Sequence, residues 1–359
     1  MTVLQLGPYP PPHGGVQTNI VAIREHLRRR GFGAPVINLT RHRAEEADEV
    51  YYPHSAKQVI GLLTSLPSDI IHLHIGGRLT GRLLALCLVC TLLPGKRVVL
   101  TFHSGGYPSW QRGRRMAPFS FRNFVLRRLD AIIAVNTEIA DLFRRLGVAP
   151  SRISVRCPYT PVAVPGHEPL AEPLRTFCES HHPLLTTVGL LEPEYDLALQ
   201  VRALAGIRRD FPNAGLVIIG SGGLEPELRR IIAEDPAGGD ALLCGDVPHQ
   251  TTVTVIARSD AFLRTTLYDG DSISVREALQ LGVPVIATDN GMRPEGVHLI
   301  PASNPEALLT AVRAVLRGSA PKTGSPSTAS DDLDDLVDLY QSLLPAGRQV
   351  VQQSTRTVL

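Results

Sequence analysis

Short apolar runs alternate with longer amphipathic stretches along most of this chain. In the first half, the apolar runs that predict strands are Val3–Leu6, Ala34–Leu39, Ile70–Ile75, Val98–Phe102, Ala131–Val135 and Ile153–Arg156. In the second half they are Leu184–Val188, Leu216–Ile219, Leu242–Gly245, Ala261–Leu263 and Pro284–Thr288. Continuous apolar runs separated by helical patterns are typical of parallel strands that are buried on both faces. The pattern predicts an α/β chain with two Rossmann-like, doubly wound domains.

Two stretches rich in turn-forming residues divide the chain. Residues 157–173 are rich in proline, and residues 318–330 are rich in Gly, Pro, Ser and Thr. Such composition favours linkers. We therefore predict an N-terminal domain over residues 1–165 and a C-terminal domain over residues 166–317. A linker over 318–330, an acidic helix over 331–345 and a disordered tail over 346–359 would follow.

The stretch from Arg264 to Asp289 carries the most informative pattern. It predicts a strand end, a polar loop over Tyr268–Ser272, a helix over about Ser274–Leu281 and a further buried strand. The unpaired amides of a helix N-terminus favour an anion such as phosphate. Asp269 in the loop and Glu277 one turn into the helix flank that position, so a ribose near Glu277 and a second hydroxyl-bearing group near Asp269 would fit. An ordinary βαβ unit with an N-capping serine and a solvated glutamate would give the same pattern.

Other candidate residues also follow predicted strands, where open α/β sheets bind ligands. Gly14-Gly15 precedes the first predicted helix, and His103 comes directly after Val98–Phe102. In the second half Gly220–Gly223 follows a strand, but it lacks the full dinucleotide-binding fingerprint. Taken alone, each of these signals also fits a plain turn or a structural histidine.

Two of these motifs together resemble a known family. The first motif starts with an acid (Asp269), seven further residues and a Glu (Glu277), and continues as Ala-Leu-x-x-Gly-x-Pro-Val-Ile-Ala-Thr-Asp to Asp289. This pattern is similar to the nucleotide-sugar site of family 4 (group 1) glycosyltransferases. The N-terminal strand, Gly14-Gly15 and helix resemble the opening of the same family. The resemblance covers roughly residues 1–317. It implies the GT-B fold, with two Rossmann-like domains facing a cleft. It also implies a retaining hexosyltransferase that moves sugar from a UDP- or GDP-sugar to a glycan or lipid-linked acceptor, with bacterial cell-surface polysaccharide synthesis as the expected setting.

The resemblance gives each candidate residue a role. Asp269, which stands where the family usually has Glu, would hold donor-sugar hydroxyls, Glu277 would hold the ribose, and His103 would lie near the reacting centre. The expected donor-binding residues are Gly14, Gly15, Gly189, Gly222, Val247, Arg264, Gly270, Asp271, Ser272, Ile273 and Ser274. The family implies no essential metal and no cofactor, because the nucleotide sugar is a substrate.

Two positions depart from the family's pattern. Its usual members carry an Arg directly after Gly189 and a Lys near Tyr195, and both bind donor phosphates, whereas this chain has Leu190 and Tyr195. Arg264 and Arg276 are candidate replacements. The departure keeps two alternatives open. One is a non-catalytic glycosyltransferase-like binding subunit, and the other is another GT-B enzyme such as a nucleotide-sugar epimerase.

The charge distribution suggests an additional partner. The formal net charge is only +2, but residues 1–165 hold 21 Lys and Arg against 9 Asp and Glu, while the remainder holds 15 against 25. A basic half predicts contact with an anionic membrane surface or a lipid-linked phosphate, although a merely basic solvated surface would look the same. Residues 107–129, which mix arginines with aromatic residues, would suit such a surface. No nucleic-acid-binding module is visible, so nucleic acid is not an expected partner.

The remaining sequence features favour a cytoplasmic protein, with peripheral association at the inner face of the membrane left open. The chain shows no signal peptide, and its longest apolar run, Leu83–Leu93, is too short to span a bilayer. Its five cysteines are scattered. Cys87 and Cys90 form a C-x-x-C within an apolar helix and lack a second pair of ligands, so we expect buried thiols rather than zinc.

Overall fold

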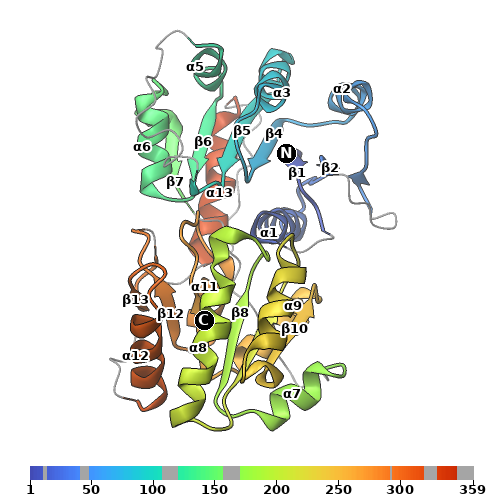
Figure 1. The fold of residues 1–359 in the computed structure, drawn as a ribbon. Coiled ribbons are helices and arrows are strands. Elements are labelled where there is room, and N and C mark those ends of the chain that lie inside the picture. Colours follow the sequence, from blue (N-terminus) through green and yellow to red (C-terminus); the bar gives the residue numbers. More distant parts are fainter. Residues whose placement is uncertain are drawn as a thin grey trace, which may run out of the picture. The chain divides into compact units, whose positions relative to one another are not determined.

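The chain folds into two compact units. The computed structural model describes residues 1–10, 14–40, 48–106, 120–156, 170–291, 293–318 and 330–345. The first unit holds residues 1–11 and 16–160 together with the C-terminal segment from Ser330, and the second holds residues 12–15 and 161–329 (Figure 1). Within the described residues, each unit contains one sheet in which all paired strands are parallel.

The first sheet has seven strands in the order β3-β2-β1-β4-β5-β6-β7. They are β1 (Val3–Gly7), β2 (Val36–Asn38), β3 (Val50–Tyr51), β4 (Ile70–Ile75), β5 (Arg97–Phe102), β6 (Ala131–Ala134) and β7 (Ile153–Val155). The chain builds outward from β1 through β2 and β3, then returns to the other side of β1 with β4. The strand order therefore reverses between β1 and β4.

Helices cover both faces of the first sheet. Alternate residues of a strand point to opposite faces, so the two faces hold different buried clusters. Val98, Leu100 and Phe102 of β5 belong to one buried cluster, and Val99 belongs to another. The first cluster is closed by α2 (Ala56–Ser65), α3 (Gly81–Leu92), α5 (Phe121–Leu126) and α6 (Thr137–Arg145). The second is closed by α1 (Gly15–Arg29) and α13 (Ser330–Leu343). The C-terminal helix, drawn in red, is thus part of the first unit (Figure 1).

The second sheet repeats this plan with six strands in the order β10-β9-β8-β11-β12-β13. They are β8 (Leu184–Val188), β9 (Gly215–Ile219), β10 (Ala241–Gly245), β11 (Ala261–Arg264), β12 (Val285–Thr288) and β13 (Val297–Ile300). The order reverses between β8 and β11. One face is covered by α8 (Leu197–Asp210), α9 (Glu225–Glu234) and α12 (Pro305–Leu316), and the other by α7 (Leu174–Ser180), α10 (His249–Ala257) and α11 (Ile273–Gln280).

The predicted fold class is confirmed, and several elements are additional to the prediction. The strands β3 and β13 and the helices α2 and α7 were not expected. Short 3₁₀ turns also occur at η1 (Pro150–Arg152), η2 (Pro193–Tyr195) and η3 (Gly238–Asp240). The predicted tail 346–359, and most of the two predicted linkers, lie outside the described residues.

The C-x-x-C of the apolar helix behaves as expected of buried thiols. Cys87 and Cys90 lie on α3, are fully buried and form no disulfide. Burial raises the pKa of both thiols to about 12, so they stay protonated at neutral pH. They are packing residues of the first unit.

Candidate functional site

Parallel α/β sheets bind ligands outside the carboxyl ends of their strands, at the point where the strand order reverses. In the second unit that point is flanked by the loop after β8, starting at Gly189, and the loop after β11, Thr265 to Ser272. The two loops are tied together, since Thr265 Oγ1 donates to the carbonyl of Tyr195 at 2.8 Å. Most of the predicted donor-binding residues lie on these loops or on α11, which follows the second loop.

The loop after β8 is shaped by the residues that depart from the family's pattern. A Cβ added to Gly189 would lie 2.2 Å from Cε1 of Tyr195, so the glycine makes room for that ring. The Tyr195 ring in turn lies beneath the guanidinium of Arg264, with Cζ 4.7 Å from the ring centroid. Leu190 is 45% exposed. The aromatic residue near the family's lysine position therefore packs against an arginine from β11.

Arg264, which is buried, and Asp269, which is half-buried, form an ion pair at this point. Arg264 Nη2 and Nε lie 2.8 and 3.0 Å from Oδ2 of Asp269, and Nη1 donates to the carbonyl of Val188 at 2.7 Å. The Arg264 side chain is 7% exposed and that of Asp269 is 15% exposed. Burial alone would raise the pKa of Asp269, but the charges of Arg264 and Arg293 outweigh it and hold that pKa below its ordinary value. The carboxylate is therefore ionised at neutral pH.

A second arginine, Arg293, joins the same carboxylate and was not expected. Its Nη1 lies 3.0 Å from Oδ2 of Asp269, and its side chain is 3% exposed. It belongs to the loop after β12, the strand next to β11. Sequence reasoning missed it because 24 residues separate it from Asp269. Only the pairing of β11 with β12 brings the two loops together.

Glu277 is buried and paired, which rules out the solvated glutamate of an ordinary βαβ unit. It is 2% exposed, and its Oε1 lies 2.6 Å from Nε2 of His249. His249 is the first residue of α10, two positions after Val247. Val247 is half-buried and packs against the core formed by β9 and α7. Sequence reasoning missed this partner because 28 residues separate His249 from Glu277.

The N-terminus of α11 is suited to an anion. The side chain of Ser272, at the cap position, accepts no hydrogen bond from the helix amides. Its hydroxyl lies 3.3 Å from that of Ser274 instead. Asp271 is paired with Arg276, whose Nε lies 2.8 Å from Oδ2. Because the Ser272 side chain does not cap the helix, the amides at the start of α11 are not satisfied by it. Together with the helix dipole, these amides would stabilise an anion in the loop.

Gly222 and Gly270 have different surroundings. A Cβ on Gly222 would lie 2.6 Å from the backbone N and O of Leu191, so this glycine permits two loops of the second unit to pack closely. Gly270 is buried and its amide donates to Oδ1 of Asp269 at 3.0 Å. Gly270 thus donates a hydrogen bond to Asp269 itself, whereas Gly222 packs against the loop that carries Leu190 and Leu191.

In the first unit, His103 and His74 lie at the ends of two neighbouring strands. Nε2 of His103 lies 3.4 Å from Nδ1 of His74, and the rings are stacked. Burial lowers the pKa of His103 to about 4, so the ring is neutral at pH 7. His74 is next to the strand-order reversal, because β4 pairs with β1. The structure thus places His103 one strand away from the expected ligand position of this sheet.

His72, two residues earlier on β4, extends this group into the interior. Its Nε2 lies 2.7 Å from Oγ1 of Thr101, and its Nδ1 lies 2.6 Å from the hydroxyl of Tyr340 on α13. The rings of His72 and His74 are 4.0 Å apart. A hydrogen-bonded and stacked series therefore runs from the C-terminal helix to the strand end that carries His103.

Gly14 and Gly15 lie at the start of α1. Gly15 is exposed, and a Cβ added there would meet nothing within 4 Å among the described atoms. The described backbone around α1 therefore does not itself demand this glycine. The close approach of a ligand at Gly14 and Gly15 stays a prediction.

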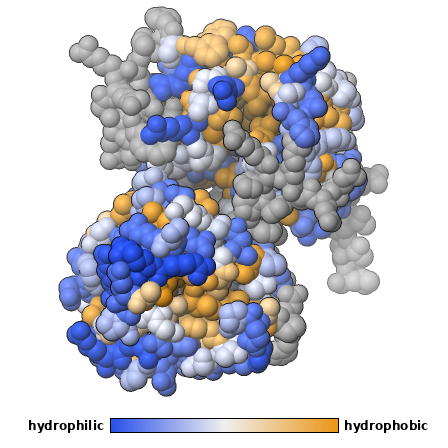
Figure 2. All heavy atoms as spheres, turned by 45° about the vertical axis from the view of Figure 1, so that its right-hand side comes forward, coloured by the Kyte–Doolittle hydropathy of each residue, from blue (hydrophilic) through white to orange (hydrophobic). Residues whose placement is uncertain are grey.

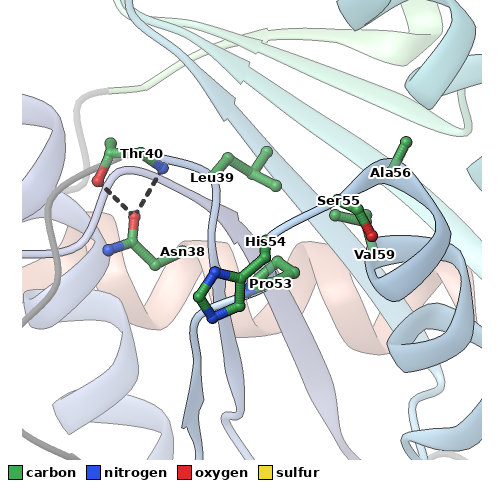
Figure 3. A pocket seen from close by; sticks show the side chains of 8 residues that line it. All are labelled: Asn38, Leu39, Thr40, Pro53, His54, Ser55, Ala56 and Val59. Carbon is green, nitrogen blue, oxygen red and sulfur yellow. Dashed lines mark hydrogen bonds between the residues drawn. The ribbon is translucent and has the colours of Figure 1, made fainter.

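A pocket of about 320 Å³ opens at the carboxyl end of β2. Figure 3 shows Asn38 and Thr40 on one side of it, Ala56 and Val59 across from them, and His54 between. Oδ1 of Asn38 accepts from the amide and hydroxyl of Thr40 at 3.0 and 2.9 Å. Both polar and apolar side chains line it, and it is open to solvent.

Two negative findings concern only the described residues. Among them, no helix is long and apolar enough to cross a membrane. No group of three or more His, Cys, Asp or Glu side chains in the same residues is arranged to hold a metal ion. Residues 107–119, which contain much of the predicted arginine and aromatic segment, lie outside the described chain.

Comparison with known proteins gives two family matches. Residues 178–323 match the model "Glycosyl transferases group 1", and residues 13–158 match "Glycosyltransferase Family 4". A phosphatidyl-myo-inositol mannosyltransferase of Propionibacterium freudenreichii is 27% identical over 228 residues, which are 62% of this chain and 52% of the relative. An amylovoran biosynthesis glycosyltransferase of Erwinia amylovora is 26% identical over 47% of this chain and 45% of its own length. The chain thus spans about half the length of these relatives.

Solved structures share the fold at low sequence identity. Anabaena HepE, solved with UDP-glucose, has a TM-score of 0.67 and 14% identity, covering 96% of this chain and 98% of that one. WaaG, a glycosyltransferase involved in lipopolysaccharide biosynthesis, has a TM-score of 0.63 and 15% identity, covering 88% and 91%. These likenesses establish the GT-B fold.

Proposed function

This chain belongs to the group 1 (family 4) glycosyltransferases, and we propose that it transfers a sugar from a nucleoside-diphosphate sugar to a glycan or lipid-linked acceptor. One observation carries the proposal. At the strand-order reversal of the second sheet, a half-buried, ionised Asp269 and a buried Glu277 flank the N-terminus of α11, which has no capping side chain. An anion with hydroxyl-bearing groups on both sides fits this arrangement.

We assign the donor's parts to these groups. The diphosphate would lie at the N-terminus of α11, near the backbone of Ser272 to Ser274. The ribose would bond to Glu277, and the transferred sugar to Asp269. The solved structure of HepE with UDP-glucose supports a nucleotide sugar as the donor, since that protein shares the fold.

The same geometry would favour departure of the nucleoside diphosphate. Negative charge grows on the leaving phosphate in the transition state, and preorganised amides and cations stabilise it there without reorganising. The helix dipole of α11 supplies partial positive charge. The Arg264, Asp269 and Arg293 group adds one net positive charge, because two guanidinium groups share one carboxylate. We propose retention of anomeric configuration, as in the family, with no essential metal or cofactor.

We propose that the first unit holds the acceptor. His103 would contact the reacting hydroxyl as a neutral imidazole, since burial lowers its pKa to about 4. The pocket that includes Asn38 and His54 opens at the same carboxyl edge of that sheet, three strands from His103. A glycan acceptor longer than one residue could extend along this edge.

We also propose that the first unit contacts an anionic membrane surface, which would place the protein at the cytoplasmic face. Exposed apolar side chains of this unit include Leu92, Phe121 and Phe124, at 62, 51 and 54%. Figure 2 shows a hydrophobic area on the first unit. Arg128 lies over the Phe124 ring at 5.8 Å, so basic and aromatic groups adjoin. Co-sedimentation with anionic but not neutral vesicles tests this, and equal binding to both would remove it.

Enzymatic turnover tests the main proposal. The purified chain is incubated with UDP-glucose, UDP-N-acetylglucosamine or GDP-mannose, with and without candidate glycan acceptors, and released nucleoside diphosphate is measured. We expect acceptor-stimulated release that Asp269→Asn abolishes, that EDTA leaves unchanged and whose product keeps the donor's anomeric configuration by NMR. The non-catalytic alternative is favoured by Leu190 and Tyr195. It predicts nucleotide or glycan binding without release from any donor.

A further inference from the structure

The carboxylate of Asp269 is unequally occupied. Oδ2 lies within hydrogen-bond distance of Arg264 Nη2 and Nε, at 2.8 and 3.0 Å, of Arg293 Nη1 at 3.0 Å and of Thr266 Oγ1 at 3.4 Å. Among the described residues, Oδ1 accepts only from the amide of Gly270, at 3.0 Å. A carboxylate oxygen offers about two lone-pair sites. Oδ2 is therefore saturated by the protein, while Oδ1 retains a site for another donor.

Arg293 is held by hydrogen bonds so that its guanidinium binds this carboxylate and exposes little surface to a ligand. Its Nη2 donates to Oγ1 of Thr266 at 2.6 Å, and its Nε donates to the carbonyl of Thr288 at 3.1 Å. With Nη1 on Asp269, each of its three nitrogens makes a bond inside the second unit. The side chain is 3% exposed. Arg293 thus acts through Asp269 and not by direct contact.

The charge of Arg293 also matters at this position. Arg264 alone would neutralise Asp269, so the second guanidinium gives the group one net positive charge. Without Arg293 the pair would be neutral and would offer no net positive charge to the donor's anionic diphosphate. Leu190 and Tyr195 supply no cation to the loop after β8. Arg293 therefore lets an acid remain ionised next to phosphate in a chain that lacks the family's usual cations.

We propose that Arg293 is a positioning residue for donor-sugar recognition: with Arg264 it fixes Oδ2 of Asp269 and directs Oδ1 toward a hydroxyl of the transferred sugar. The inference rests on the proposed function. It concerns the sugar moiety of a nucleoside-diphosphate hexose and not the nucleotide. Its distinguishing consequence is a loss of affinity that is larger for the nucleotide sugar than for the nucleoside diphosphate.

The experiment compares two ligands on the full chain. Affinities for a nucleoside diphosphate and for the corresponding nucleoside-diphosphate sugar are measured by calorimetry for the wild type, Arg293→Gln, Arg293→Lys and Asp269→Asn. The matched control is Arg313→Gln, which breaks the exposed ion pair with Asp210 in the same unit. Thermal unfolding of every variant accompanies the titrations.

We expect Arg293→Gln to weaken binding of the nucleotide sugar roughly tenfold more than binding of the nucleoside diphosphate, the effect of one hydrogen bond to a charged group. A loss caused by the missing charge should be common to both ligands, since both carry the diphosphate. Arg293→Lys should show most of the same loss, because an ammonium cannot reproduce the planar fork. Combining Arg293→Gln with Asp269→Asn should add nothing, since both act on one contact. The control should bind both ligands like the wild type.

Several outcomes would overturn the proposal. Equal weakening for both ligands would make Arg293 a phosphate-binding or purely structural residue. Unchanged affinities would show that Asp269 needs no second arginine. Should Arg293→Gln fail to fold, unaltered sugar recognition in Arg293→Lys or Asp269→Asn would reject it equally well. If the wild type binds no nucleoside diphosphate, the proposed function itself fails, which is a different result from any of these.

Discussion

Nε2 of His249 lies 2.6 Å from Oε1 of Glu277, so the glutamate assigned to the donor's ribose is held by a histidine from the neighbouring helix. Glu277 is almost completely buried, whereas the His249 side chain is 37% exposed. A carboxylate fixed through one oxygen presents the other in a set direction. The pair therefore gives the ribose site a geometry that the glutamate alone would not have.

Removing His249 should weaken nucleotide binding. In His249→Ala, the Glu277 carboxylate loses its partner and its orientation, at a cost of about 1–3 kcal/mol. We expect a corresponding rise in the Kd of the bound nucleotide in calorimetry, and partial recovery in His249→Gln, whose amide can still donate. Wild-type affinity in His249→Ala would show that the pair has no part in binding.

Restoring a cation to the loop after β8 should strengthen nucleotide binding. Leu190 is 45% exposed, so Leu190→Arg introduces a guanidinium without disturbing a core. At an exposed site a new ion pair is worth about 0.2–1 kcal/mol, and this gain should shrink as salt is raised. Leu299→Arg, at a 52% exposed position on β13, is the matched control and should have no effect. Equal responses of the two variants would argue against a diphosphate near Leu190.

The buried histidines should make the first unit sensitive to acid. Burial lowers the pKa of His72 to about 3, from an ordinary value of 6.5. Between these two values the unfolded chain binds a proton that the folded chain does not, so stability falls as the pH falls through this window. At pH 5 the loss is about 2 kcal/mol for one such histidine.

Denaturant titrations at pH 7 and pH 5 measure this effect. His72→Gln removes the titrating group, so its stability should change less with pH than that of the wild type. His54→Gln, at an exposed position, should keep the wild-type dependence. Identical pH dependence in the wild type and His72→Gln would contradict the assignment.

Tyr340 should contribute to the stability of the first unit from the far end of the chain. Its hydroxyl lies 2.6 Å from Nδ1 of His72, and its side chain is fully buried. Tyr340→Phe leaves a ring nitrogen buried without a partner, which should cost about 1–3 kcal/mol of folding free energy. The denaturation midpoint checks this, with the exposed Ser342→Ala of the same helix as a control. A midpoint equal to that of the wild type would show that the bond adds nothing.

Local sequence patterns predicted the parts of the site that one stretch of chain supplies. Asp269 and Glu277 are separated by seven residues on a strand–loop–helix segment, so strand and helix periodicity were sufficient to bring them to one edge. Arg264 could be placed for the same reason. The apolar runs likewise predicted both sheets, because buried parallel strands read as continuous hydrophobic segments.

Contacts between distant segments could not be predicted in this way. Arg293 reaches Asp269 only because β12 pairs with β11, and His249 meets Glu277 only because α10 lies beside α11. Gly222 looked like a ligand-binding glycine, but its close neighbour is the backbone of Leu191. The edge strands β3 and β13 are short and only partly buried, so their hydrophobic signal is weak.

The most direct test of a donor site in the second unit is calorimetric titration of UDP, GDP, ADP and dTDP into the wild type and Glu277→Ala. Glu227→Ala, at an exposed position of the same unit, is the control. We expect one nucleotide to bind the wild type and the control, and Glu277→Ala to weaken this binding by roughly tenfold or more. Absence of binding by all four nucleotides, or equal binding to Glu277→Ala, would contradict it.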